Sequence, residues 1–191
     1  TRKVVVKGKH SSEKKTKYLN EFELKLLQRS LDLSNYENYD WIILLIAKTG
    51  LRFGEALGLT KDDIDFEQQI ITVNKTWDYK SCSGGFKPTK NASSVRKVSI
   101  DWKLAMQLSS MVNELPSDQP IFIQKRIFNS TVNSLLKKHC EKLEIPVISI
   151  HGLRHTHASL LLFAGVSVAS VAKRLGHAEM TTTQQTYLHI I

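Results

Sequence analysis

The stretch that decides how this chain folds and acts reads IHGLRHTH at residues 150–157. In a helix, His151 and Arg154 would share one face because they are three residues apart. Downstream, LGH stands at residues 175–177, and Tyr187 follows ten residues after it. A guanidinium forks onto phosphate oxygens, imidazoles move protons or donate hydrogen bonds, and a phenol can attack as a nucleophile. This combination of side chains suits a reaction at a phosphate.

These residues resemble the end of the catalytic domain of the tyrosine recombinases, a family of phage and transposon integrases. That family carries an H-x-x-R box, an L-G-H box and a Tyr about ten residues further on. An upstream box should supply a second Arg, and TGLRFGE at residues 49–55 provides Arg52. The family also has a Lys on a β-hairpin, and PTKNASSVRKV at residues 88–98 resembles that segment with Lys90 at the catalytic position. The resemblance covers nearly the whole chain, from about residue 17 to residue 191.

The resemblance, together with the chemistry of phosphodiester cleavage, assigns a role to each residue. Two arginines can clamp the non-bridging oxygens because a guanidinium stays charged and donates in a planar fork. The Tyr would attack phosphorus, with His151 as candidate base, Lys90 as candidate acid for the leaving 5′ oxygen and His177 holding the phosphate. Glu55 is expected to orient an Arg. The six expected catalytic residues are Arg52, Lys90, His151, Arg154, His177 and Tyr187.

The resemblance also implies the reaction and its partners. Tyr187 would form a 3′-phosphotyrosyl bond and release a 5′ hydroxyl, and a 5′ hydroxyl of another strand would then attack that bond. No metal, cofactor or ATP is expected. The expected substrates are double-stranded attachment sites, bound by a homotetramer together with accessory excision or host DNA-bending proteins. The outcome would be integration or excision of a phage or mobile element in the cytoplasm of a bacterial host.

Composition agrees with an ordinary folded domain that binds a polyanion. The chain has 191 residues, of which 41% are hydrophobic and 24% charged, and a net charge of +9. Such a basic chain favours nucleic acid as a partner, although charge alone is a weak indicator. The longest apolar run, residues 41–47, is far too short to span a bilayer, and the sequence shows no signal peptide. The two cysteines, Cys82 and Cys140, predict reduced thiols rather than a disulfide framework.

The charge distribution suggests two parts. Residues 1–17 hold seven Lys or Arg against one Glu, so this segment carries +6 of the net charge. We interpret it as a basic linker with a short β-like patch at residues 4–6, and residues 18–191 as the catalytic domain. In the resembled family a helical DNA-binding domain precedes such a linker, and its absence from this sequence predicts that the chain is a fragment.

Periodicity predicts an α+β fold that is mainly α-helical, with one small antiparallel β-sheet. The β-region is expected between residues 63 and 99, with strands around residues 70–77 and 95–100, a turn at residues 81–85 and Lys90 near the hairpin tip. Residues 121–123 are expected to be a short buried strand or extended segment. The expected helices cover residues 19–33, 36–49, 53–57, 102–115, 129–143, 151–164, 167–176 and 181–187.

Other interpretations stay open for several of these residues. His151, His155 and His157 could form a metal site because i and i+4 spacing suits a helical pair, but no carboxylate accompanies them. His155 and His157 fit packing or hydrogen-bonding roles better, and His189 fits no specific role. Arg52 could simply pair with Glu55 in a structural ion pair.

Four other functions compete with recombination. A type IB topoisomerase or a telomere resolvase would share the chemistry, but the L-G-H box is more like that of integrases. A non-catalytic DNA-binding module would tolerate loss of the nucleophile or the clamp, yet all six positions carry fitting residues. A metal-dependent nuclease would need a cluster of carboxylates.

The sequence around Tyr187 predicts weak anchoring of that side chain. The preceding run at residues 181–185 is polar, and only four residues follow the Tyr. We therefore expect Arg52, His151, Arg154 and His177 to form a cluster, with the Tyr187 hydroxyl outside hydrogen-bonding range of it or poorly ordered.

Overall fold

The computed structural model describes residues 18–35, 37–113, 115–123 and 125–187, and within these ranges the fold is mainly helical with small antiparallel sheets. The patch at residues 4–6, the linker at residues 1–17 and His189 lie outside the described residues. The α-helices are α1 Glu21–Ser30, α2 Asp40–Thr49, α3 Phe53–Leu57, α4 Trp102–Val112, α5 Asn129–Lys142, α6 Ile150–Phe163, α7 Val168–Leu175 and α8 Met180–Tyr187. The strands are β1 Ile64–Asp65, β2 Ile70–Val73, β3 Lys75–Trp77, β4 Phe86–Pro88 and β5 Arg96–Ser99, and 3₁₀ turns cover Lys61–Asp63 (η1) and Ala92–Ser94 (η2).

The helix boundaries follow from capping residues in the sequence. Asn20 caps α1 in a reciprocal pair with Glu23, and Ser149 and Ser167 accept hydrogen bonds from the first turns of α6 and α7. At the other end, α2 and α7 stop at Gly50 and Gly176, which take left-handed φ values of 70° and 67°. Glycine adopts this conformation without steric cost, so both helices end where the sequence predicts.

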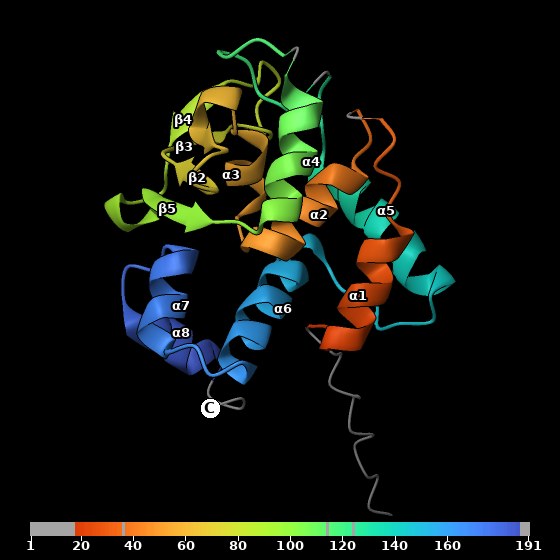
Figure 1. Cartoon of the computed structure of the whole chain (residues 1–191), viewed down its shortest axis with the longest axis vertical. Helices are drawn as coiled ribbons and strands as arrows, with labels where there is room; N and C mark the ends of the chain where they lie inside the picture. The colour runs from red at the N-terminus through yellow and green to blue at the C-terminus, as the bar shows by residue number, and fades with distance from the viewer. Residues whose placement is uncertain (1–17, 36, 114, 124, 188–191) are drawn as a thin grey trace, which may run out of the picture.

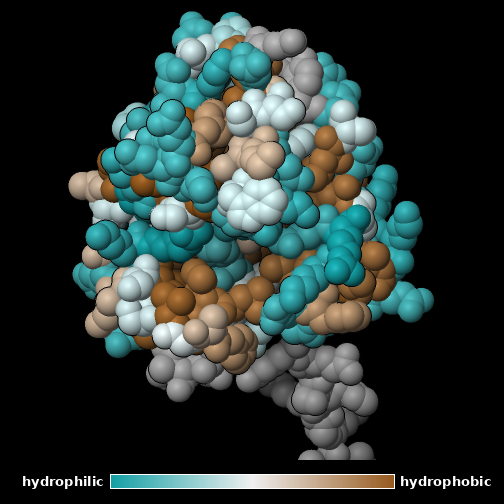
Figure 2. All heavy atoms as spheres, viewed as in Figure 1, coloured by the Kyte–Doolittle hydropathy of each residue, from teal (hydrophilic) through white to brown (hydrophobic). Residues whose placement is uncertain are grey.

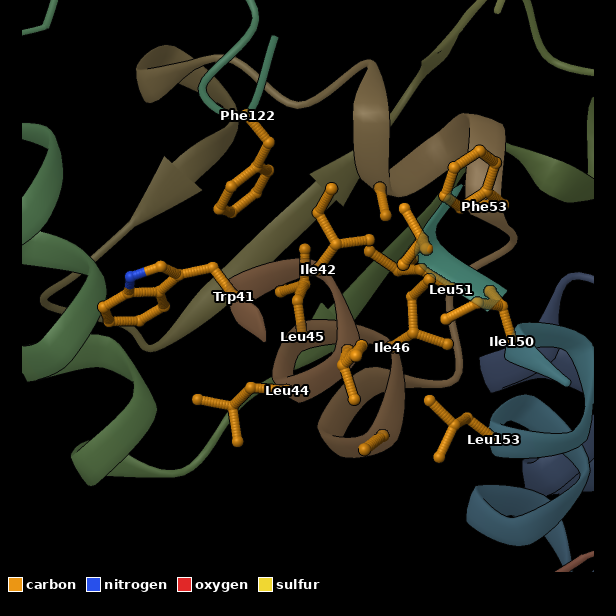
Figure 3. Packing of buried hydrophobic residues seen from close by; sticks show 14 of the residues in the cluster. Trp41, Ile42, Leu44, Leu45, Ile46, Leu51, Phe53, Phe122, Ile150 and Leu153 are labelled. Atoms are coloured by element: carbon orange, nitrogen blue, oxygen red, sulfur yellow. The ribbon is translucent and has the colours of Figure 1, made fainter. Parts of the chain in front are cut away.

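Helix α2 forms the centre of the core. Ile42, Leu45 and Ile46 are fully buried, and Leu153 of α6 is buried against the same cluster. Figure 3 shows Leu153 and Ile150 of α6 directed towards the α2 side chains. In Figure 1 the strands and α3 lie on one side of α2, and helices α1 and α5 lie on the other side. Helices α6, α7 and α8 lie together below α2 in this view, near the C-terminus of the chain. The nearly continuous apolar sequence of α2 therefore reflects burial on all sides.

The described residues form two small sheets instead of the single sheet expected. One sheet has the order β1-β2-β5, and the other is the β3–β4 hairpin. The sheet does not continue from β2 into β3, because β3 turns away from the first sheet and packs against α3. At that contact a side chain on Gly58 would collide with the backbone of Thr76 at 2.8 Å, so the close approach needs a glycine.

Three local expectations also need correction. Lys90 is not at the hairpin tip but on a bend between β4 and η2. Helix α2 begins at Asp40, four residues later than residue 36, because its carboxylate accepts a hydrogen bond from the Asp32 backbone amide and holds the preceding loop. Residues 121–123 form a turn rather than a strand, although Ile121 and Phe122 are buried as expected.

The surface and the cysteines agree with the composition. Figure 2 shows hydrophilic side chains separating the apolar areas on the face that it presents. Among the described helices, none combines the length and apolar character needed to cross a membrane. Cys82 is exposed and Cys140 is buried, and both are free thiols.

Candidate active site

Arg52 is held at the junction between α2 and α3. Its backbone amide donates to Glu55 Oε2 at 2.8 Å, and its Nη1 donates to Glu55 Oε1 at 2.8 Å. Its Nη2 donates to the carbonyl of Gly176 at 3.1 Å, which brings the LGH segment to the same place. The Arg52 side chain remains about one third exposed. The guanidinium is thus fixed in orientation while part of it stays available to a ligand.

Glu55 joins Arg52 to a second arginine that the sequence analysis did not identify. Arg96 Nη2 donates to Glu55 Oε2 at 2.9 Å, and Arg96 is itself buried. Burial alone would raise the pKa of Glu55, but the hydrogen bonds and charges of Arg96 and then Arg52 outweigh it and lower the pKa. The sequence could have indicated that Arg96 is buried, because it stands two residues before Val98 on β5 and alternate residues of a strand face the same side.

Glu55→Gln is expected to destabilise the protein by about 3–5 kcal/mol, because it leaves two guanidiniums beside a neutral amide. The lowered pKa means that the ion pairs contribute fully at neutral pH, and this contribution is lost as the pH falls below the ordinary Glu range. Thermal unfolding at neutral and acidic pH measures both effects. Glu21→Gln, on an exposed pair with Lys25, is the matched control and should leave the melting temperature nearly unchanged. Equal melting temperatures for both variants would contradict the role given to Glu55.

Arg154 lies deeper than Arg52 and links two helix ends. Its Nη1 donates to the carbonyl of Gly50 and its Nη2 to the carbonyl of Leu175, both at 2.7 Å. Only 3% of the residue is exposed. Burial and then the charge of Arg52 lower the pKa of Arg154 to about 9, so the guanidinium stays positive at neutral pH. The two arginine boxes, about one hundred residues apart in sequence, therefore meet where α2 and α7 end.

A cleft of about 570 Å³ collects four of the six expected catalytic residues. Arg52, Lys90, His151 and Arg154 all line it, and so does Glu55. The residues come from the α2–α3 junction, the bend after β4, and α6. Lys80 also lines this cleft, so its walls are strongly basic. A cleft with this concentration of positive donors suits a phosphate.

The two site histidines are neutral at physiological pH. Burial and then the charges of Arg154 and Arg52 lower the pKa of His151, which lines the cleft. Burial and the same arginines lower the pKa of His177 to about 4. His177 Nδ1 lies 2.7 Å from the Thr183 hydroxyl, a contact that fixes the orientation of the ring. A neutral imidazole can accept a proton or donate a hydrogen bond, which are the roles expected of His151 and His177 from the sequence.

Tyr187 contradicts the expectation in its anchoring, but its hydroxyl is hydrogen-bonded to His155 and not to the cluster expected around Arg154, as predicted. Tyr187 is only 2% exposed and packs with Ala158, Val171 and Leu175 in a small apolar cluster, so the expectation of weak anchoring is wrong. The polar residues before Tyr187 suggested few core contacts, but α8 packs closely on α7 and directs the Tyr187 ring inwards. The hydroxyl is hydrogen-bonded to His155 Nδ1 at 2.8 Å rather than to Arg154 or His177. Burial raises the pKa of Tyr187 to about 12, and Arg154 opposes this only partly.

His157 has a structural position, as one of the open interpretations held. Its Nδ1 lies 3.1 Å from the carbonyl of Ala47, and Arg174 Nε donates to its Nε2 at 2.8 Å. Burial and the charge of Arg174 lower the pKa of His157 to about 3, so it links α2, α6 and α7 as a neutral ring. Within the ranges that the structure describes, no group of three or more His, Cys, Asp or Glu residues is placed to hold a metal ion.

Comparison with known proteins decides the family. Residues 17–191 match the phage integrase family. The chain belongs to the phage integrase family. An integrase from Staphylococcus phage L54a is 32% identical over 161 residues, and the match covers 75% of this chain and 46% of that protein. The ICEBs1 integrase of Bacillus subtilis (strain 168) is 34% identical over 163 residues, covering 74% of this chain and 42% of that protein. This member of the family therefore spans less than half the length of these curated relatives.

A solved structure supports the integrase fold independently. The Tn1549 transposon integrase in complex with transposon right-end DNA superposes with a TM-score of 0.76 at 19% identity, covering 93% of this chain and 64% of that one. This similarity confirms the expected fold class, a mainly helical integrase domain with small antiparallel sheets.

Proposed function

We propose that this chain is the catalytic domain of a site-specific tyrosine recombinase, which cleaves and rejoins DNA through a 3′-phosphotyrosyl intermediate. Family membership supports recombination of a phage or mobile element. The observation that carries the mechanism is the cleft in which Arg52, Lys90, His151 and Arg154 converge from separate segments. Its donors and charge match a phosphodiester rather than a neutral substrate.

Each step of the proposed cleavage has a residue to perform it. The Tyr187 oxygen attacks phosphorus and the bond from phosphorus to the 5′ oxygen breaks. Arg52, Arg154 and a hydrogen bond from His177 stabilise the added negative charge on the non-bridging oxygens. Lys90 gives a proton to the leaving 5′ oxygen, and His151, the base expected from the sequence, lies in the same cleft. Attack by a 5′ hydroxyl on the phosphotyrosine reverses these steps and joins the strands.

The test of this function is a suicide substrate. Duplex DNA from the element's end, nicked just beyond the cleavage site, loses a short fragment after attack and cannot be religated. A covalent protein–DNA adduct resistant to denaturant is the expected product. Non-covalent binding alone, with no adduct on any end sequence of the element, would favour a DNA-binding module instead.

Lys90→Ala is expected to lower cleavage of ordinary DNA by about 10²–10⁴-fold, the usual contribution of a general acid. Cleavage should recover on DNA with sulfur at the 5′ bridging position, because a thiolate leaves without a proton. Arg52→Ala is the matched control: it should not recover, since sulfur does not replace the clamp. Equal recovery of both variants in single-turnover assays would remove Lys90 from the acid role.

We further propose that the reaction needs no metal ion. Positive side chains already surround the cleft, so a divalent cation would add repulsion rather than charge neutralisation. Adduct formation should persist in excess EDTA. Complete loss, restored by Mg²⁺ or Mn²⁺, would support a metal-dependent nuclease.

The proposed substrates are double-stranded attachment sites, brought together by a homotetramer with accessory excision or host DNA-bending proteins in a bacterial cytoplasm. The Tn1549 integrase, which shares this fold, is in complex with transposon right-end DNA, and this supports DNA as the partner proposed for this chain. Mixing the protein with paired sites and measuring the mass of the complex tests the tetramer.

A further inference from the structure

The hydroxyl of Tyr187 and the imidazole of His155 form the contact that the proposed mechanism leaves unexplained. His155 Nδ1 lies 2.8 Å from the Tyr187 oxygen, within the range for direct proton transfer. The two rings come from α6 and α8, and their centroids are 5.6 Å apart. Tyr187 is almost completely buried and His155 is half-buried, so the pair is shielded from bulk water.

The phenol needs such an acceptor. With a pKa of about 12, only about one molecule in 10⁵ would be ionised at neutral pH. A protonated phenol is a weak nucleophile, so attack on phosphorus has to be accompanied by removal of its proton. The base that does this must lie within hydrogen-bonding reach of the hydroxyl, directly or through one water, and His155 is in direct contact with it.

His151 and His155 both lie on helix α6 but face different parts of the site. His151 and His155 lie one turn apart, and their rings meet edge to face with centroids 4.6 Å apart. His151 lines the cleft with Arg52 and Arg154, whereas His155 contacts the nucleophile. His155 thus stands between Tyr187 and the cleft histidine.

We propose that His155 is a catalytic residue that takes the proton of Tyr187. This inference rests on the proposed function. In the resting state His155 would carry its proton on Nε2 and accept the phenolic hydrogen bond at Nδ1. As the Tyr187 oxygen bonds to phosphorus, the O–H bond breaks and its proton moves to Nδ1, giving an imidazolium. When the phosphotyrosine is later attacked, the phosphorus–oxygen bond breaks and the imidazolium returns the proton to the departing phenolate.

The contact also permits another interpretation, in which His155 only holds Tyr187 in a retracted position. His155→Asn distinguishes the two because its amide oxygen can occupy the place of Nδ1 and still accept the hydrogen bond. This variant keeps the position of the phenol but cannot take a proton. Our proposal predicts a fall of about 10²–10⁴-fold in single-turnover adduct formation on the nicked substrate, with DNA binding unchanged. A latch would give unchanged or faster adduct formation, which would overturn the proposal.

Imidazole in solution gives a second measurement. His155→Ala leaves a space beside the Tyr187 hydroxyl, and added imidazole should restore adduct formation in proportion to its concentration. His151→Ala, treated in the same way, is the comparison that separates the cleft histidine from the residue in contact with the phenol. If imidazole rescued only the His151 variant, His151 would be the direct acceptor of the proton. If imidazole did not rescue His155→Ala, His155 would only position the phenol. Both results would overturn the proposal.

The two levels of inference fail in different ways. If the unmodified protein forms no adduct on any nicked end of the element, the proposed recombinase function fails. If the unmodified protein forms the adduct and His155→Asn does so at the same rate, only the role of His155 fails.

Discussion

Tyr187→Phe is expected to abolish covalent adduct formation on the nicked substrate while leaving DNA affinity unchanged. The ring stays in its apolar cluster, but the atom that would bond to phosphorus is gone. No residual activity is expected, since no other side chain can replace a missing nucleophile at this position. The measurement is a denaturing gel of the reaction together with a binding titration.

Folding of the Phe variant can be checked separately. The substitution removes one hydrogen bond to His155 and should change the free energy of unfolding by about 0.5–1.5 kcal/mol. Tyr39→Phe, a half-buried tyrosine that packs against the main core, is the matched control and should form the adduct normally. An adduct from Tyr187→Phe would falsify the assignment of the nucleophile.

Arg154→Lys is expected to have the second largest effect, on both activity and stability. Lysine keeps the positive charge but cannot hold the carbonyls of Gly50 and Leu175 together in a fork. One buried carbonyl would lose its partner, at a cost of about 1–3 kcal/mol. The remaining ammonium would also sit in the wrong place for the phosphate, so adduct formation should fall by about 10²–10³-fold.

The control for this substitution is Arg29→Lys on the exposed face of α1, which should cleave and melt as the unmodified protein does. Arg154→Lys is informative because charge is conserved. If it kept full cleavage activity, the fork geometry would be irrelevant and a point charge would suffice. Melting curves run beside the cleavage assay separate a damaged fold from a damaged clamp.

The helical part of the fold was predictable because its signals are local. Helix α2 is a continuous apolar run closed by Gly50, and Asn20 and Ser167 are short polar residues that cap α1 and α7. The strands were less predictable. The break between β2 and β3 depends on α3 packing against β3, and that contact joins segments whose local sequence does not encode it.

The candidate site shows the same division. Four boxes in the right order predicted the residues of the cleft, and the structure brings Arg52, Lys90, His151 and Arg154 together there. Arg96 was missed because its role depends on Glu55, forty-one residues away. The contact of His155 with Tyr187 was missed because the hydroxyl lies thirty-two residues away, on a helix whose inward face the polar sequence of α8 concealed.

The way in which both site arginines end on backbone carbonyls has a consequence for the direction of the reaction. Arg154 binds Gly50 and Leu175, and Arg52 binds Gly176, so the guanidiniums rest on the negative ends of α2 and α7. The positive guanidinium groups are therefore already held together in the folded protein, and they need not reorient when a phosphate binds. A rigid field of this kind stabilises the pentacoordinate phosphorus equally, whichever oxygen is entering and whichever is leaving. In the proposed reaction the site should therefore lower the barrier for breaking a strand and for joining it to the same extent, and the direction of strand transfer is not set by these arginines.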